Sequence, residues 1–226
     1  MKKMVSIPFM LMGIFFVVCL IVSNLLEAKI IQLGPITATA GLLVFPISYI
    51  INDCISEVWG YKKARLVIWS GFAMNFIVVG LAQLAVFMPA APFWDGGESF
   101  DFVFGMTPRI VVASLCAFLA GSFLNAYVMS KMKIMSKGRN FSLRAIVSTL
   151  AGESVDSIIF FPIAFGGMIP VEALLVLVGT QALLKSAYEI IALPLTIRVV
   201  RYVKRVDGSD AYDANVSFNP FKVSDL

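Results

Sequence analysis

Acidic residues stand in pairs inside stretches of the chain that are otherwise apolar. Asp53 and Glu57 lie four residues apart, and Glu153 and Asp156 lie three apart. If these stretches are helices, each spacing places both carboxylates on one helix face. An ionisable side chain at the centre of a membrane costs at least about 2.5–3.5 kcal/mol, and such residues mark ligand sites and solute paths. The pairs therefore predict a polar cavity inside a membrane protein.

A third polar stripe, at four-residue steps, consists of Gln181, Lys185 and Glu189. At a rise of about 1.5 Å per residue, Glu153 and Asp156 lie roughly 12 to 16 Å inside their expected helix. Lys185 lies roughly 20 Å inside its own helix, so both groups are expected near the midplane. They form the expected ligand-reading layer. Asp53 and Glu57 are expected nearer one membrane surface and Asn24 nearer the other.

The charges in these stretches do not balance. Five acids accompany Lys185, the one base that is clearly within an apolar stretch. The excess must be neutralised by protonation, by arginines from the loops, or by a ligand rich in hydrogen-bond donors. Such a cavity suits a polar ligand that bears donors better than it suits an anion.

Structural roles are the alternative for several of these residues. Lys185 and Glu189 could form an ion pair that only stabilises their helix, and Asp53 and Glu57 could be satisfied by the basic loop that follows, particularly by Arg65. Single amides are more often contacts between helices than ligand groups. This applies to Asn24, Asn75, Gln83 and Asn125.

Several kinds of chemistry are excluded by what the sequence lacks. It contains no histidine, which removes Ser-His and Cys-His catalysis and the common zinc sites. Its three cysteines have no metal-binding spacing, and no Walker motif is present, so we expect neither a metal nor a cofactor. An intramembrane aspartyl hydrolase using Asp53 and Asp156 is an alternative, but the GxGD signature of such enzymes is absent. We therefore expect a protein that is not an enzyme.

The composition requires a membrane. Of the 226 residues 59% are hydrophobic and only 14% charged, and apolar stretches of about 20 residues, enough to cross a bilayer, recur along the chain. We predict an all-α membrane protein, a bundle of about six transmembrane helices. The expected spans are Ile7–Leu26, Ile36–Trp59, Leu66–Met88, Ile110–Met129, Ala145–Phe165 and Val171–Val200.

Basic and acidic loops alternate along the chain. Lys and Arg gather before the first span, after the second, after the fourth and after the sixth, whereas the other loops are acidic. Since cytoplasmic loops carry the excess of basic residues, both termini are predicted to be cytoplasmic. The basic residues then face lipid headgroups, and we expect no directly bound nucleic acid. Residues 1–205 form the expected six-helix transmembrane domain and residues 206–226 a polar, mostly disordered cytoplasmic tail.

The loop between the third and fourth spans is the longest. It reads PAAPFWDGGESFDFVFGMTPR and is rich in Pro, Gly and aromatic residues. We expect an external cap or a short interfacial helix there, which could act as a lid.

The polar segments resemble the bacterial queuosine precursor transporters. Residues 46–65 read PISYIINDCISEVWGYKKAR, which matches the second helix of that family with its N-D and E-x-W-G positions. Further matches are TPRIVVASLCAFLAGSFLNAYVMSKMK, STLAGESVDSIIFFPIAFGG and KSAYEIIALPLT. The resemblance extends from about Asn24 to Arg201.

This resemblance implies import of 7-cyano-7-deazaguanine or 7-aminomethyl-7-deazaguanine across a bacterial inner membrane, for transfer RNA modification. A guanine-like edge offers two adjacent N–H donors that one carboxylate can accept, while Asn, Gln or Lys bonds the ring carbonyl. An aromatic wall would stack on the base, with Tyr49, Phe160 and Tyr188 as candidates. The predicted substrate-binding residues are Glu153, Asp156, Glu189, Lys185, Gln181, Asn52, Asp53, Asn125, Glu57, Asn24 and Tyr188.

The energy source is left open by the sequence. The six-helix plan also resembles the substrate-binding components of energy-coupling-factor transporters, so a subunit driven by a separate ATPase is the alternative. Two further possibilities for the energy source are protonation of a deep carboxylate and facilitated diffusion followed by trapping of the ligand inside the cell. The expected partners are the deazaguanine ligand and membrane lipid, and a homodimer is also open.

Overall fold

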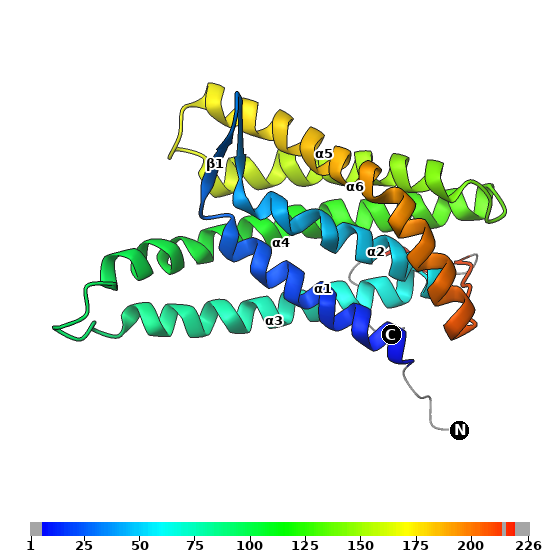
Figure 1. Ribbon diagram of the computed structural model, residues 1–226, viewed down its shortest axis with the longest axis horizontal. Helices are drawn as coiled ribbons and strands as arrows, with labels where there is room; N and C mark the ends of the chain where they lie inside the picture. Colours follow the sequence, from blue (N-terminus) through cyan, green and yellow to red (C-terminus); the bar gives the residue numbers. More distant parts are fainter. Residues whose placement is uncertain (1–5, 214–215, 220–226) are drawn as a thin grey trace.

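The computed structural model describes residues 6–213 and 216–219. Within these residues, six α-helices form an elongated bundle in which α1 begins and α6 ends at the same end (Figure 1). The α-helices are α1 (Ile7–Leu26), α2 (Phe45–Trp59), α3 (Tyr61–Phe87), α4 (Gly97–Met135), α5 (Phe141–Phe165) and α6 (Val171–Asp207).

Five of the helices are long and apolar enough to cross a membrane: α1, α3, α4, α5 and α6. The sixth, α2, has 15 residues, most of them buried, and lies inside the bundle. At 1.5 Å per residue it is about 22 Å long, which is less than the hydrocarbon thickness. The chain is thus a multi-pass, all-α membrane protein, as its composition predicted.

The expected start of the second span, Ile36, is wrong. Residues 30–39 form an antiparallel hairpin of β1 (Ile30–Leu33) and β2 (Ile36–Thr39), and the 3₁₀ helix η1 (Ala40–Leu43) follows. The hairpin leans on α6, where the Thr180 hydroxyl lies 3.3 Å from the Thr37 carbonyl oxygen. Irregular backbone is tolerated at membrane depth where protein buries it, and Ala38 and Thr39 are fully buried.

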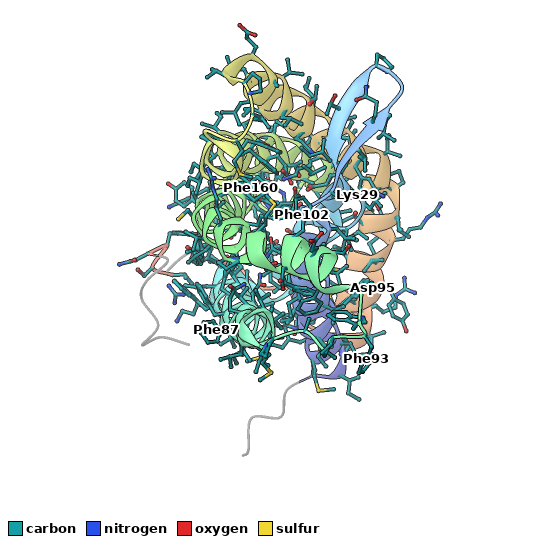
Figure 2. The ribbon with its side chains drawn as sticks, turned by 90° about the vertical axis from the view of Figure 1, so that its left-hand side faces the viewer. Lys29, Phe87, Phe93, Asp95, Phe102 and Phe160 are labelled. Carbon is teal, nitrogen blue, oxygen red and sulfur yellow. The ribbon has the colours of Figure 1, made fainter. Side chains whose placement is uncertain are left out.

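The long loop expected between the third and fourth spans is mostly helix. The α4 helix begins at Gly97 and has 39 residues, so residues 88–96 alone form the turn. Pro108 lies inside α4, where a cap or lid was expected. In the end-on view, Phe87, Phe93 and Asp95 lie at the edge of the bundle, and Phe160 lies among the helices (Figure 2). Phe87 and Phe93 are exposed, as aromatic residues at a membrane surface often are.

The tail after α6 packs on the protein over the residues that the structure describes, where disorder was expected. Asp213 accepts hydrogen bonds from the Tyr61 backbone N–H and from the Ser130 hydroxyl. The Ala211 N–H donates to the Val58 carbonyl. An acidic side chain at the first turn of α3 is stabilising because the helix leaves backbone N–H groups unpaired there. The tail therefore ties α2, α3 and α4 together at the end where α6 finishes.

Two glycines let α4 and α5 approach closely. A Cβ atom at Gly121 would lie 2.7 Å from the Gly152 carbonyl oxygen and 3.0 Å from the Asp156 Cβ. Small residues at such positions allow helix backbones to pack in membranes. This contact fixes where α5 holds its acidic residues relative to α4.

We expect Gly121→Ala to lower the free energy of unfolding by about 1–3 kcal/mol, because the added methyl group overpacks a backbone contact. Thermal unfolding in detergent measures the effect. Gly80→Ala on α3 is the matched control, since no atom lies within 4 Å of its added Cβ. An unfolding temperature for Gly121→Ala equal to that of the control would contradict this packing.

Candidate functional site

The centre of the bundle holds a buried cluster of charges, here called the inner cluster: Glu153 and Asp156 of α5 with Lys185 and Glu189 of α6. The Lys185 Nζ donates to the Asp156 carboxylate at 2.8 Å and lies 3.6 Å from the nearest Glu153 oxygen. Glu153 is fully buried and Lys185 is 2% exposed. One cation thus faces two carboxylates of the neighbouring helix, in a region that the sequence placed near the membrane centre.

Lys185 and Glu189 do not form the ion pair that their four-residue spacing allows. Lys185 reaches across to α5, and the Nζ also lies 3.8 Å from the centre of the Phe45 ring. Glu189 instead accepts a hydrogen bond from the Thr149 hydroxyl. The cation is therefore held by acids and an aromatic face, a geometry that the spacing within one helix could not show.

The hairpin positions a further polar group beside this cluster. Gln181 of α6 is fully buried and donates from Nε2 to the Thr39 hydroxyl at 2.7 Å. Thr39 ends β2, so the irregular segment orients an amide that would otherwise be free to rotate. The Oε1 atom of Gln181 has no hydrogen-bond partner and remains an available acceptor.

Several other buried polar atoms in the described chain also have no hydrogen-bond partner. Buried polar groups are normally satisfied, so a group of unpaired ones in one region is typical of a ligand site. Among them are atoms from α1, α2, α4 and α6: Asn24 Oδ1 and Nδ2, Asn52 Nδ2, Asn125 Oδ1 and Glu189 Oε1.

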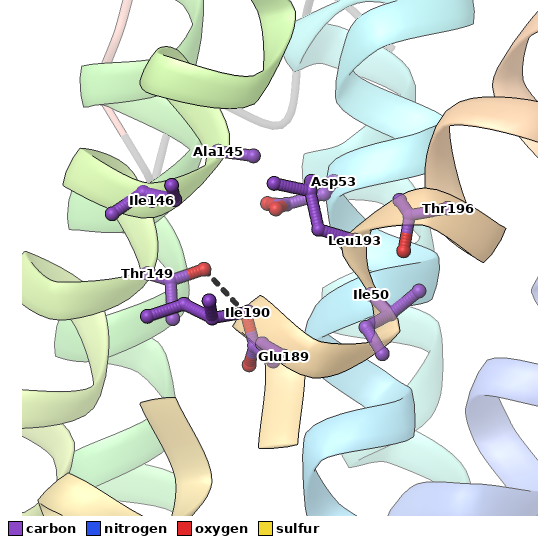
Figure 3. A pocket seen from close by; sticks show the side chains of 9 residues that line it. All are labelled: Ile50, Asp53, Ala145, Ile146, Thr149, Glu189, Ile190, Leu193 and Thr196. Atoms are coloured by element: carbon purple, nitrogen blue, oxygen red, sulfur yellow. Dashed lines mark hydrogen bonds between the residues drawn. The ribbon is translucent and has the colours of Figure 1, made fainter. Parts of the chain in front are cut away.

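A small cavity lies between α2, α5 and α6. Its polar lining consists of Asp53, Thr149, Glu189 and Thr196, and the Thr149 hydroxyl points to Glu189 (Figure 3). The space measures about 10 Å³, which is close to the room that one water molecule needs. The Asn125 side chain of α4 donates a hydrogen bond to the Asp53 carboxylate at 2.6 Å. The cavity suits water or a proton, and is far too small for a purine-sized ligand.

A second charged cluster lies where α2 and α6 end, and is here called the basic-end cluster: Glu57, Lys133, Arg144, Lys204 and Asp210. Glu57 receives hydrogen bonds from Arg144 and Lys204, both at 2.7 Å, and Lys133 lies 3.5 Å away. These three cations compensate its charge fully. Glu57 therefore has no free edge for a ligand, and the structure places it in a structural network.

Arg65 is not the partner of Asp53 or Glu57 that the sequence suggested. Its guanidinium donates to the Asn219 carbonyl at 2.6 Å, in the tail. The cations that replace it come from α4, α5 and α6, between 76 and 147 residues away along the chain.

Asp210 lies at the edge of the basic-end cluster. Burial by itself would raise the pKa of Asp210, but the hydrogen bonds from Lys133 and Lys204 have the larger combined effect, so this pKa is lowered.

The predicted binding residues are brought into the bundle interior, apart from one. Tyr188 is 38% exposed on α6 and does not join the interior set, so its candidate role as an aromatic wall is dropped. Tyr49 is fully buried and the Phe45 ring faces Lys185, so two aromatic side chains of α2 lie in the interior. The predicted binding residues that are buried are Glu153, Asp156, Glu189, Lys185, Gln181, Asn52, Asp53, Asn125, Glu57 and Asn24.

Thr39, Thr149, Phe45 and Glu27 were not predicted as site residues. The two threonines orient Gln181 and Glu189. A lone Thr or Phe in an apolar helix gives no signal in sequence, since both are common in membrane helices. Glu27 is 2% exposed, and its position just after the first span is a signal that could have been followed.

Comparisons with known proteins identify relatives. The family described as "Putative vitamin uptake transporter" matches residues 39–199. A "Probable queuosine precursor transporter" of Bacillus subtilis (strain 168) is 29% identical over 80% of this chain and 78% of its own. The "Queuosine precursor transporter" of Escherichia coli (strain K12) is 23% identical over 68% of this chain and 67% of its own. No solved structure matches significantly.

Proposed function

The chain belongs to the vitamin uptake transporter family and is a membrane transporter rather than an enzyme, and from this premise we propose that it imports a queuosine precursor. The proposed ligands are 7-cyano-7-deazaguanine and 7-aminomethyl-7-deazaguanine, and the proposed location is a bacterial cytoplasmic membrane. The names of the relatives support the ligand class. The site residues below are inferred from burial and hydrogen bonding.

The observation that carries the proposal is the state of Glu153. Its carboxylate is fully buried, and the nearest cation, Lys185, stays at 3.6 Å and donates to Asp156 instead. A guanine-like edge presents two adjacent N–H donors, which a carboxylate accepts in a bidentate arrangement. Glu153 is the acid with free acceptor oxygens beside the cation, so we assign it to the guanine edge.

The remaining donors and acceptors of the ligand have nearby partners. Lys185, held by Asp156, is placed to donate to a ring carbonyl, and Oε1 of Gln181 is a free acceptor. The amides of Asn24 and Asn52 supply further unpaired groups. The faces of Phe45 and Tyr49 offer a stacking surface. Asp53 and Glu189 are left out of the ligand contacts because they line the adjoining water-sized cavity.

The conformation described here has to open before a ligand can enter. Pockets for small molecules usually measure roughly 300 Å³ or more, and the cavity beside the inner cluster measures about 10 Å³. We infer a closed state in which Lys185 and its two acids hold α5 and α6 together. Opening would separate these helices and expose Glu153 to one side of the membrane at a time.

The proposed orientation places both termini in the cytoplasm. The basic loops support it, and α1 begins at the same end of the bundle where α6 finishes (Figure 1). The basic-end cluster then lies on the cytoplasmic side, and the β1–β2 hairpin lies on the external side.

The direct test uses a bacterial strain that cannot make the precursor. We expect expression of this chain to restore queuosine in transfer RNA at low external 7-cyano-7-deazaguanine, measured by mass spectrometry of nucleosides. Purified protein in liposomes, without an ATPase, should also exchange labelled ligand across the membrane. Absence of both rescue and exchange, with the protein present in the membrane, would overturn the proposed function.

A further inference from the structure

The buried acids of the described chain differ in how their charges are compensated. Glu57 has three cations within 4 Å, and Asp156 has Lys185 at 2.8 Å. Asp53 and Glu189 have no Lys or Arg within 4 Å among the described residues, although they are 3% and 6% exposed. A buried carboxylate without a counter-charge is very costly, so some positive charge must accompany these two.

Glu189 also meets a second acid. Its carboxyl group accepts a hydrogen bond from Thr149, one turn before Glu153 on α5, and Lys185, one turn before Glu189 on α6, lies 3.6 Å from a Glu153 oxygen. Residues four apart share a helix face, so Glu189 and Glu153 face each other between α5 and α6. Two ionised carboxylates can only accept hydrogen bonds, and Oε1 of Glu189 has no donor. Two acids this close repel each other strongly when both are ionised, so in the closed state they share a proton. The proton therefore fits between Glu189 and Glu153, where it supplies the missing donor.

The small cavity offers this proton a path from Glu189 to Asp53. Glu189 and Asp53 both line it, and Asp53 lies on α2, one helical turn from Glu57 and the basic-end cluster. The cavity has room for about one water molecule between the two acids. Asn125 holds the Oδ1 atom of Asp53 by a hydrogen bond at 2.6 Å, which fixes this carboxylate at the wall of the cavity.

Charged and titratable groups surround the pair from both neighbouring helices and from α6 itself. These groups are Tyr49 and Asp53 from α2, Asp156 from α5, and Lys185 from α6.

We propose that Glu189 is the proton-coupling residue of this transporter: it carries a proton shared with Glu153 and delivers it through Asp53 to the basic end of the bundle. When ligand donors occupy Glu153, the proton stays on Glu189. After the ligand leaves, it passes by way of the cavity to Asp53 and then to water, and Glu153 and Glu189 take up a new proton from the opposite side. One proton thus moves with one ligand. The identity of the ligand, but not the proton site, rests on the proposed function.

Transport in liposomes tests the coupling. With the membrane potential clamped by potassium and valinomycin, one pH unit, acid outside, should drive about tenfold accumulation of 7-cyano-7-deazaguanine at one proton per ligand. We expect Glu189→Gln, which resembles a permanently protonated Glu189, to keep ligand exchange and lose this accumulation. Asp53→Asn should lose accumulation as well. Glu172→Gln, an exposed acid at the start of α6, is the control and should match the native protein.

The two possible failures are distinguishable. Accumulation that ignores the proton gradient, or that follows a sodium gradient, would overturn the coupling and leave ligand exchange intact. If no deazaguanine is exchanged at all, the infrared spectrum of the purified protein decides about the proton. A carboxylic acid C=O band at neutral pH that disappears in Glu189→Gln supports the site, and a spectrum in which that band is absent or unchanged overturns it.

Discussion

Replacing Glu153 by Gln is expected to weaken binding of 7-cyano-7-deazaguanine by on the order of 100-fold. A hydrogen bond to a charged group contributes about 1.5–3 kcal/mol, and the substitution removes one acceptor and turns an NH₂ group toward an N–H donor of the ligand. The contact between Lys185 and Asp156, at 2.8 Å, remains in place, so the helices should stay together. Isothermal titration calorimetry in detergent measures the affinity.

The control for this experiment is Glu172→Gln, which changes the same residue type at an exposed position of α6. Unchanged thermal unfolding of Glu153→Gln would show that the loss comes from the site rather than from folding. If Glu153→Gln binds the ligand as tightly as the control, Glu153 does not read the guanine edge. Asp156 would then be the next acid to test, because it lies on the same face of α5.

The second large effect is expected at the basic-end cluster. Glu57→Gln should lower the free energy of unfolding by about 3–5 kcal/mol, because it leaves buried cations without their counter-charge. Arg144 is 1% exposed and Lys133 is 3% exposed, so water cannot replace the lost carboxylate. The readout is the unfolding temperature in detergent micelles.

Glu98→Gln is the matched control because Glu98 is an exposed carboxylate in the first turn of α4. Surface substitutions of this kind usually change stability by less than about 0.5 kcal/mol. Equal unfolding temperatures for the two variants would mean that the cluster does not hold α2, α4, α5 and α6 together. Loss of stability with ligand affinity retained would separate this network from the inner cluster.

The two clusters show that the role of a buried acidic residue depends on which cations lie near it. Glu57 and Asp53 are one helical turn apart in the same motif, and the sequence could not tell them apart. In the structure, Glu57 meets three cations and is structural, whereas Asp53 meets an amide and a small cavity. The cations that compensate an acid come from residues far away along the chain, and a single sequence does not show which of them pack against it.

The membrane class, the number of helices and most of the buried acidic residues were determined by the sequence alone. A stretch of about 20 apolar residues leaves the backbone few alternatives in lipid, because a helix satisfies its own hydrogen bonds. An acid within such a stretch is costly enough to be recognised without a structure. The motifs of α2, α4, α5 and α6 also carried the resemblance that the family match confirms.

Tertiary structure decided how those residues are paired. Lys185 pairs with Asp156 of α5 rather than with Glu189, and Arg65 donates a hydrogen bond to the tail. Tyr188 is partly exposed, and a hairpin that orients Gln181 replaces the expected start of the second span. The physical reason is that a helix fixes spacing along one face, while partners across a bundle depend on how backbones approach. The close contact at Gly121 and Gly152 sets the α4–α5 approach, and no pattern within one helix predicts it.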